Sequence, residues 1–162
     1  FPGKILVLEL DGKKEYICQK DAFMCASPDV DIRMHFRKRL GTGFFGGEGF
    51  ILQRISGKGK TFVELAGEVI ELNLKKGQVL KVDTGHIAMY EPTVDFDIVM
   101  VEGIKNIIVG GEGLFLSTLK GPGKVWLQTM PLTNLARKIG AFYTSKRPGA
   151  VSNFFEGISR VV

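Results

Sequence analysis

The sequence is poor in the residues that build metal centres and disulfide frameworks. Its 162 residues include two cysteines and two histidines, too few for a disulfide-dense scaffold or a four-thiolate zinc site. No stretch reaches the about 18 apolar residues that a membrane-spanning helix needs. The first residues, Phe1-Pro2-Gly3, do not begin a signal peptide, because no basic segment leads into an apolar one. The sequence therefore predicts a protein without a transmembrane segment.

Glycine, in contrast, is abundant, with 21 residues. Apolar residues make up 44% of the chain and charged residues 24%, with a formal net charge of +5. These proportions are typical of a globular protein and not of a disordered one.

The chain aligns with itself, without gaps, after a shift of 64 residues. Residues 46–49 (Gly-Gly-Glu-Gly) fall on residues 110–113, which have the same sequence. Self-similarity at a fixed period is typical of repeat architectures. We therefore predict two β repeats, 3–66 and 67–130, within one compact domain, followed by a helix and tail over residues 131–162.

Each predicted repeat has the pattern of β-structure. Residues 30–36 and 94–98 alternate between apolar and polar side chains, which is typical of half-buried strands. Short apolar runs alternate with Gly and Pro at intervals of roughly eight to twelve residues, as in sandwiches and barrels. We interpret residues 57–59 and 121–123 as hairpin turns. The predicted fold class is all-β, with tandem pseudo-symmetric β-sandwich or double-stranded β-helix-like repeats.

The tail after Pro131 has a helical pattern. Its apolar residues recur with the spacing of one helix face: Leu132, Leu135, Ile139 and Phe142. We expect one short amphipathic helix that packs on the sheets, with Thr133 or Asn134 as its N-cap. A helix that binds a membrane surface is the alternative, although such helices usually have a denser Lys/Arg face.

No catalytic motif is complete in this sequence. Residues 41–46 fit G-x-G-x-x-G, but no helix follows them, and the counterpart segment 105–110 has glycine only at its last position. There is no G-x-S-x-G and no H-E-x-x-H. We therefore predict a non-enzymatic protein with no catalytic residues, no metal site and no cofactor.

The cysteines and histidines fit structural roles. Cys18 and Cys25 fall on Val82 and Met89 after the 64-residue shift, so we expect both to be small core residues. His86 belongs to Asp83-Thr84-Gly85-His86, which we interpret as a turn. A metal-assisted enzyme using His86, Glu48 or Glu112 is the alternative.

The Gly-Glu-Gly triplets have two interpretations. A carboxylate between glycines can accept hydrogen bonds from a local bulge, and a fold needs such a bulge in every repeat. The alternative is a carboxylate pair that joins Asp31 and Asp95 at a ligand or metal site. The structural interpretation is favoured for these residues: Gly47, Glu48, Gly49, Gly111, Glu112 and Gly113.

A basic segment is the strongest candidate for a binding site. Basic side chains near the aromatic residues Phe36 and Phe44 suit a phosphate backbone or an anionic lipid surface. The segment comprises Arg33, Arg37, Lys38 and Arg39. The counterpart positions carry Asp97, Val101, Glu102 and Gly103, so the fold does not require this charge. A solvated basic loop is the alternative.

Three stretches carry a resemblance to a known family: residues 46–50, 83–86 and 110–128. In these stretches the chain resembles the altered-inheritance-of-mitochondria protein 24 family, over about residues 3–143. The resemblance implies an all-β repeat fold grouped with that of the trp RNA-binding attenuation protein. It implies no catalytic residues. Family members are usually longer, so we expect a further repeat ahead of residue 1.

These observations favour an oligomeric structural or interaction scaffold. The alternative function is a module that binds nucleic acid or anionic lipid through the basic segment 33–39. The expected partners are further copies of the chain or other proteins, with RNA or anionic lipid as the other possibility. We expect a cytoplasmic protein of prokaryotic rather than mitochondrial origin.

Overall fold

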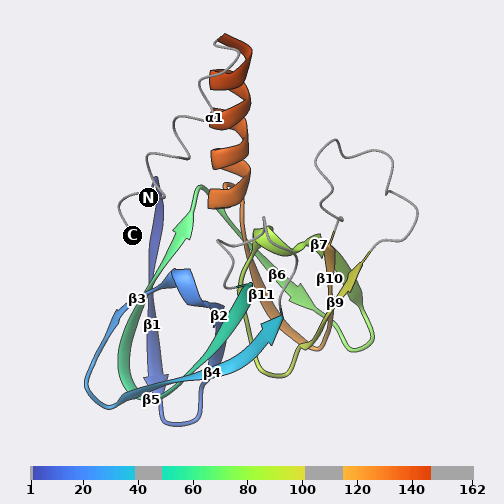
Figure 1. Cartoon of the computed structure of the whole chain (residues 1–162). Helices are drawn as coiled ribbons and strands as arrows, with labels where there is room; N and C mark the ends of the chain where they lie inside the picture. Colours follow the sequence, from blue (N-terminus) through green and yellow to red (C-terminus); the bar gives the residue numbers. More distant parts are fainter. Residues whose placement is uncertain (1, 39–48, 101–114, 147–162) are drawn as a thin grey trace.

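The computed structural model describes residues 2–38, 49–100 and 115–146. Strands dominate these residues, and one α-helix follows them near the C-terminus (Figure 1). The predicted all-β class with a short C-terminal helix is confirmed.

The strands before residue 67 are organised by one long strand, β5 (Phe50–Ala66). It pairs antiparallel with β1 (Gly3–Asp11), β2 (Tyr16–Gln19), β3 (Phe23–Ala26) and β4 (Val30–Lys38). The short 3-10 helix η1 (Lys20–Ala22) connects β2 to β3. Alternation along β1 turns Leu8 and Leu10 into the core, because successive side chains of a strand point to opposite faces.

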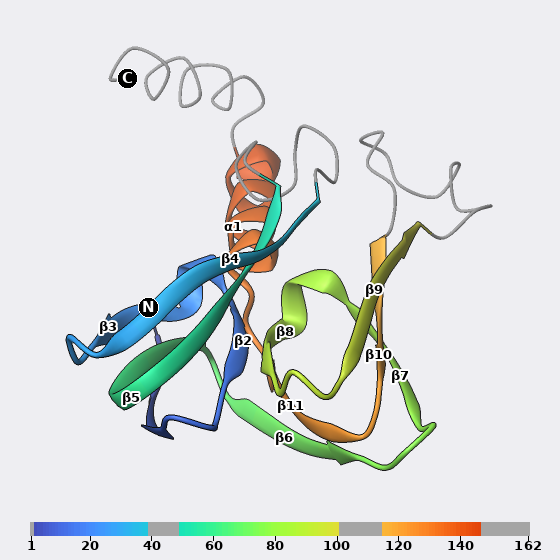
Figure 2. The same ribbon diagram turned by 90° about the horizontal axis from the view of Figure 1, so that it is seen from below.

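The strands after residue 66 form around two shorter strands. β11 (Gly123–Gln128) lies between β6 (Val69–Leu74) and β8 (Ile87–Tyr90), and β10 (Phe115–Lys120) lies between β7 (Val79–Asp83) and β9 (Asp95–Met100). The 3-10 helix η3 (Thr84–His86) connects β7 to β8. β2 also pairs with β8. Within the described ranges, this contact joins the strands into one eight-stranded sheet, and β7, β10 and β9 form a separate sheet (Figure 2).

Strand pairs in the two halves share their register at a spacing of 64 residues. The shared pairs are Leu10–Gly59 and Leu74–Gly123, Tyr16–Ile55 and Leu80–Leu119, Asp31–Ser56 and Asp95–Lys120, and Cys25–Phe62 and Met89–Trp126. One corner contact is shared as well. The Lys60 N–H donates to Ser27 Oγ at 2.9 Å, and the Lys124 N–H donates to Glu91 Oε2 at 2.8 Å. The boundaries predicted at residues 66 and 130 stay predictions.

The glycine segments at 57–59 and 121–123 are not hairpin turns, and that interpretation was wrong. β5 runs through residues 57–59, and β10 and β11 pair with other strands instead of with each other. Residues 50–57 of β5 pair with β2 and β4, and residues 58–66 pair with β1 and β3. Gly59 has a φ of +138°, and a Cβ there would lie 2.8 Å from the Ser27 Cβ. The glycines therefore bend a strand where it changes partners.

Two hydrophobic clusters fill the interior, and each contains residues from both halves. One cluster consists mainly of second-half residues but includes Ile17, Phe50 and Leu52. The other consists mainly of first-half residues but includes Met89 and Trp126, with Ala88 beside them. The two halves therefore complete each other's cores.

The helix α1 (Leu132–Lys146) lies apart from the sheets for most of its length (Figure 1). It begins directly after Pro131, so the predicted N-caps Thr133 and Asn134 lie inside the first turn, one to two residues too late. Leu132 is 53% exposed and Ile139 is 50% exposed. The prediction that the apolar face of this helix packs on the sheets was therefore wrong at these two positions.

Candidate functional site

The basic segment lies on the edge strand β4, which pairs only with β5 in the part of the chain described. The Arg33 Nη2 lies 3.4 Å from Asp31 Oδ2, and both side chains are largely exposed. Exposed ion pairs of this kind contribute about 0–1 kcal/mol to stability. Arg37 is also exposed. Arg39 lies outside the described residues.

Lys38 has a structural contact. Its ammonium group donates a hydrogen bond to the backbone carbonyl of Ile98 on β9, with an N–O distance of 2.7 Å. The Ile98 N–H donates to the Asp97 carboxylate at 2.7 Å. Charged side chains that occupy the backbone groups of an edge strand block further strand pairing there. Lys38 therefore protects the edge of β9 and is half-buried.

A pair of arginines concentrates positive charge beside β4. Arg33 lies directly opposite Arg54 in the β4–β5 register, so both side chains point to the same face of the sheet, where like charges repel. Arg54 forms an ion pair with Glu15. His35 lies at a bulge in β4. Its pKa is lowered by partial burial and, second, by the charge of Arg54.

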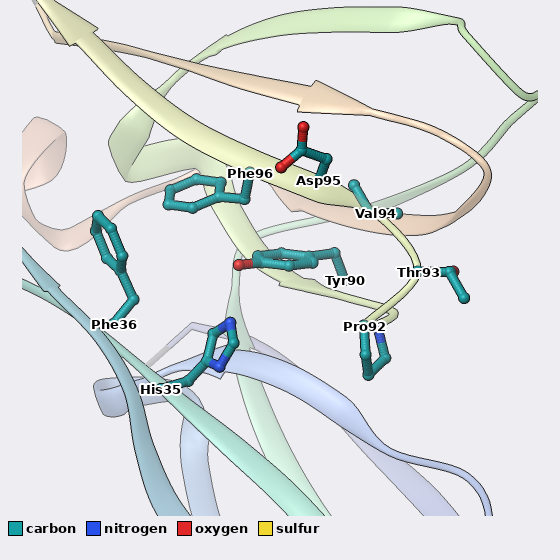
Figure 3. A pocket seen from close by; sticks show the side chains of 8 residues that line it. All are labelled: His35, Phe36, Tyr90, Pro92, Thr93, Val94, Asp95 and Phe96. Atoms are coloured by element: carbon teal, nitrogen blue, oxygen red, sulfur yellow. The ribbon is translucent and has the colours of Figure 1, made fainter.

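An open cleft of about 320 Å³ lies between β4 and the corner that joins β8 to β9. Figure 3 shows His35 and Phe36 on one side and Tyr90, Pro92 and Thr93 on the other. The ring of Phe96 stacks on Tyr90 at a centroid distance of 5.4 Å and meets Phe36 edge-on at 5.3 Å. These contacts make an aromatic wall. The side chains that line the cleft do not combine a nucleophile with a base.

His86 fastens the helix to the sheet. Its Nδ1 lies 2.7 Å from the Gln128 carbonyl oxygen, and its Nε2 lies 3.2 Å from the amide nitrogen of Asn134 on α1. Because a carbonyl only accepts, Nδ1 carries the proton and Nε2 accepts from the amide. The predicted turn is also present, since Asp83 accepts a hydrogen bond from the Gly85 N–H at 3.0 Å. His86 therefore has a structural role.

Most of the Gly-Glu-Gly residues lie outside the described residues, namely Gly47, Glu48, Gly111, Glu112 and Gly113. Gly49 is described. It is buried and has a φ of +86°, which favours glycine. Among the residues with described placement, no group of three or more His, Cys, Asp or Glu side chains is arranged to hold a metal ion.

An exposed apolar face covers the outside of β1, β5 and β3. We call it the outer face, and it consists of Ile5, Val7, Met24, Cys25 and Phe62. Ile5, Met24 and Val7 are 55%, 53% and 52% exposed, and Phe62 is half-buried. Cys25 is exposed, so the prediction that both cysteines are core residues was right for Cys18 and wrong for Cys25.

The sequence analysis missed this outer face, although β1 carries a signal for it. Residues 5–8 are Ile-Leu-Val-Leu, apolar on both faces of the strand. Continuous apolar runs are typical of strands that are covered on both sides. In the structure, only the side with Leu8 and Leu10 faces the core.

Comparison with known proteins identifies the family. The profile of the family described as mitochondrial biogenesis AIM24 matches residues 1–130. This chain belongs to the AIM24 family. The resemblance noted from the sequence is thus confirmed. The grouping with the trp RNA-binding attenuation protein and the further N-terminal repeat stay predictions.

Two streptococcal proteins are similar to this AIM24 chain. An uncharacterised protein of Streptococcus pyogenes serotype M6 is 29% identical over 136 residues, which covers 83% of this chain and 53% of the relative. The crystal structure of a Streptococcus pyogenes structural-genomics target matches with a TM-score of 0.69 and 26% identity, covering 87% of this chain and 61% of that one. The chain thus spans about half the length of the curated relative.

The described part of the AIM24 chain also bears on membranes. None of the helices in residues 2–38, 49–100 and 115–146 is long and apolar enough to cross a membrane.

Proposed function

We propose that this AIM24 chain is a non-enzymatic scaffold that self-associates. The observation that carries the proposal is the outer face, where Ile5, Val7 and Met24 each expose more than half of their surface. Contiguous exposed apolar residues mark sites of interaction. The scaffold would act in a prokaryotic cell, which the bacterial relatives support.

Unpaired strand edges add to this support. β1 and β3 each pair only with β5 within the described ranges. An exposed edge presents unpaired N–H and C=O groups and is a template for pairing with another chain. Apolar side chains and free backbone groups therefore occur together on the same side of the molecule.

The first prediction concerns the mass of the assembly. We expect native mass spectrometry and sedimentation velocity to show oligomers that increase with protein concentration. Met24→Glu introduces a charge into the outer face and should shift the distribution toward the monomer. Ile139→Glu is the matched control, because Ile139 is similarly exposed, at 50%, but lies on α1. A wild-type chain that is monomeric at every concentration would contradict the proposal.

The pairing of Arg33 with Arg54 favours a second candidate function, the binding of phosphate groups on nucleic acid or anionic lipid. Two cationic side chains on one face, next to the exposed Arg37, suit such a surface. The ion pairs with Asp31 and Glu15, and the engagement of Lys38 by Ile98, weigh against it.

The second prediction tests this candidate with single-stranded RNA and with anionic vesicles as separate probes. Binding should weaken with salt, with a logarithmic slope of about −0.7 to −0.9 for each phosphate neutralised. Arg33→Gln combined with Arg37→Gln should reduce both the affinity and the slope. Lys58→Gln, on an exposed lysine outside β4, is the control. Equal affinity of the double variant and the wild type would rule out this use of β4.

A further inference from the structure

The joint between the two halves buries one face of β8 and β11. β2 pairs with the outer edge of β8, so that Cys18 lies opposite Met89 and Ile17 lies opposite Tyr90. The ring of Tyr16 contacts that of Trp126 edge-on, at a centroid distance of 5.8 Å. Met89 is fully buried as a result, and Trp126 is 6% exposed.

The first half has the equivalent face without this cover. β3 pairs with β5 in the register in which β8 pairs with β11, including the bulge. The other edge of β3 has no strand partner in the part of the chain that is described. Cys25 stands where the second half has Met89, and it is exposed. Met24 is 53% exposed, whereas Ala88, 64 residues later, is fully buried.

The complementary edge belongs to β7. β7 pairs with β10 in the register in which β2 pairs with β5. The outer edge of β2 pairs with β8, but the outer edge of β7 has no strand partner within residues 2–38, 49–100 and 115–146. β7 carries Leu80 and Val82 where β2 has Tyr16 and Cys18. β3 and β7 lie on opposite sides of the molecule in both views (Figure 1 and Figure 2).

We propose that a second copy of this chain docks its β7 edge against β3, and so repeats between molecules the joint that each molecule contains once between β2 and β8. The inference rests on the proposed self-association and specifies its interface. In the register of the internal joint, Val82 of one protomer lies opposite Cys25 of its partner, and Lys81 lies opposite Ala26. The contact is head-to-tail, so it adds copies into a ring or an open filament.

Two features favour a copy of this chain as the occupant. The strand that already covers β8 is β2, and β7 is the strand of the second half that shares the register of β2. The outer edges of β1 and β6 offer no such precedent, because neither has a strand partner among the described residues. Pairing between β3 and β7 therefore extends an interface that the molecule already uses.

The third prediction is a cross-link. The variant Val82→Cys places a thiol opposite the native Cys25 of the neighbouring protomer. The change is small in volume and retains the fold. Oxidation of this variant with copper phenanthroline should give a ladder of disulfide-linked oligomers on a non-reducing gel. Mass spectrometry of the ladder should find the disulfide between Cys25 and the thiol introduced at position 82.

Two controls define the register. Val82→Cys combined with Cys25→Ser should give no ladder. Lys81→Cys moves the thiol by one residue to the other face of the strand, and its ladder should form several-fold more slowly. A ladder that forms equally well from Lys81→Cys would overturn the proposed register.

A second measurement does not depend on cross-linking. Cys25→Lys should dissociate the wild-type oligomers in sedimentation velocity, and Cys25→Ser should retain them. If the wild type forms oligomers that survive Cys25→Lys and no Cys25 link appears with Val82→Cys, the chain self-associates but the β3–β7 interface is wrong. If the wild type is monomeric throughout, the proposed scaffold function fails and this interface fails with it.

Discussion

At the scale of single residues, the Tyr90 hydroxyl is a polar group in an apolar place. Tyr90 is 1% exposed, and its hydroxyl oxygen has no hydrogen-bond partner among the described residues. An unpaired buried polar group costs about 1–3 kcal/mol. Burial raises the pKa of Tyr90 above its ordinary value, and the charge of Asp95 raises it further, whereas Arg54 lowers it.

The fourth prediction follows from this hydroxyl. Tyr90→Phe removes the unpaired group and should raise the free energy of unfolding by about 1 kcal/mol at neutral pH. Because the pKa is raised in the folded state, the phenol loses its proton more readily in the unfolded chain. The wild type is therefore stabilised below a pH of about 10 and loses this stability as the pH rises. Urea unfolding between neutral and alkaline pH should show a shallower loss for Tyr90→Phe.

Tyr16→Phe is the control for this prediction. Tyr16 is only half-buried, so its variant should change the stability at neutral pH by much less. A Tyr90→Phe variant that is less stable than the wild type at neutral pH would show that the hydroxyl has a partner.

At the scale of elements, local patterns predict which segments are strands but not which strands they contact. The alternation at residues 30–36 correctly indicated β4, because the period of a strand depends on its own side chains. The glycines at 57–59 indicated a turn, yet β5 continues through them because β1 and β3 pair with its far end. Cys25 was taken for a core residue because position 89 is buried. That burial depends on β2, a strand that β3 has no counterpart for within the described ranges.

The candidate site was less predictable than the fold for the same reason. Arg33, Arg37 and Lys38 are adjacent in sequence and suggested one cationic patch, but Lys38 is held by the Ile98 carbonyl of a distant strand. The outer face needed the reverse kind of information, namely which apolar residues stay uncovered. That depends on the long-range packing of the two halves and is not contained in any short segment.

At the scale of the whole molecule, the interlocking of the two cores matters more than the likeness of the two halves. Ile17 belongs to the cluster of the second half, and Trp126 belongs to that of the first. Neither half therefore completes its own core. Domains that share a core in this way unfold together, whereas independent domains unfold in separate steps.

The fifth prediction is a single cooperative unfolding transition. Trp126 is the only tryptophan of the chain, and because it lies in the joint its fluorescence reports on the contact between the halves. At concentrations that favour the monomer, urea curves from fluorescence and from far-ultraviolet circular dichroism should have the same midpoint. Ile17→Ala should lower both midpoints together, by about 2–5 kcal/mol in the free energy of unfolding.

Leu132→Ala, at a position that is 53% exposed on α1, is the control for this variant and should leave both midpoints nearly unchanged. A fluorescence transition that precedes the loss of circular dichroism would show that the joint opens while the halves stay folded. The β2–β8 pairing would then be a separable contact. The proposed pairing between β3 and β7 of neighbouring molecules, which copies its register, would be expected to be equally easy to separate.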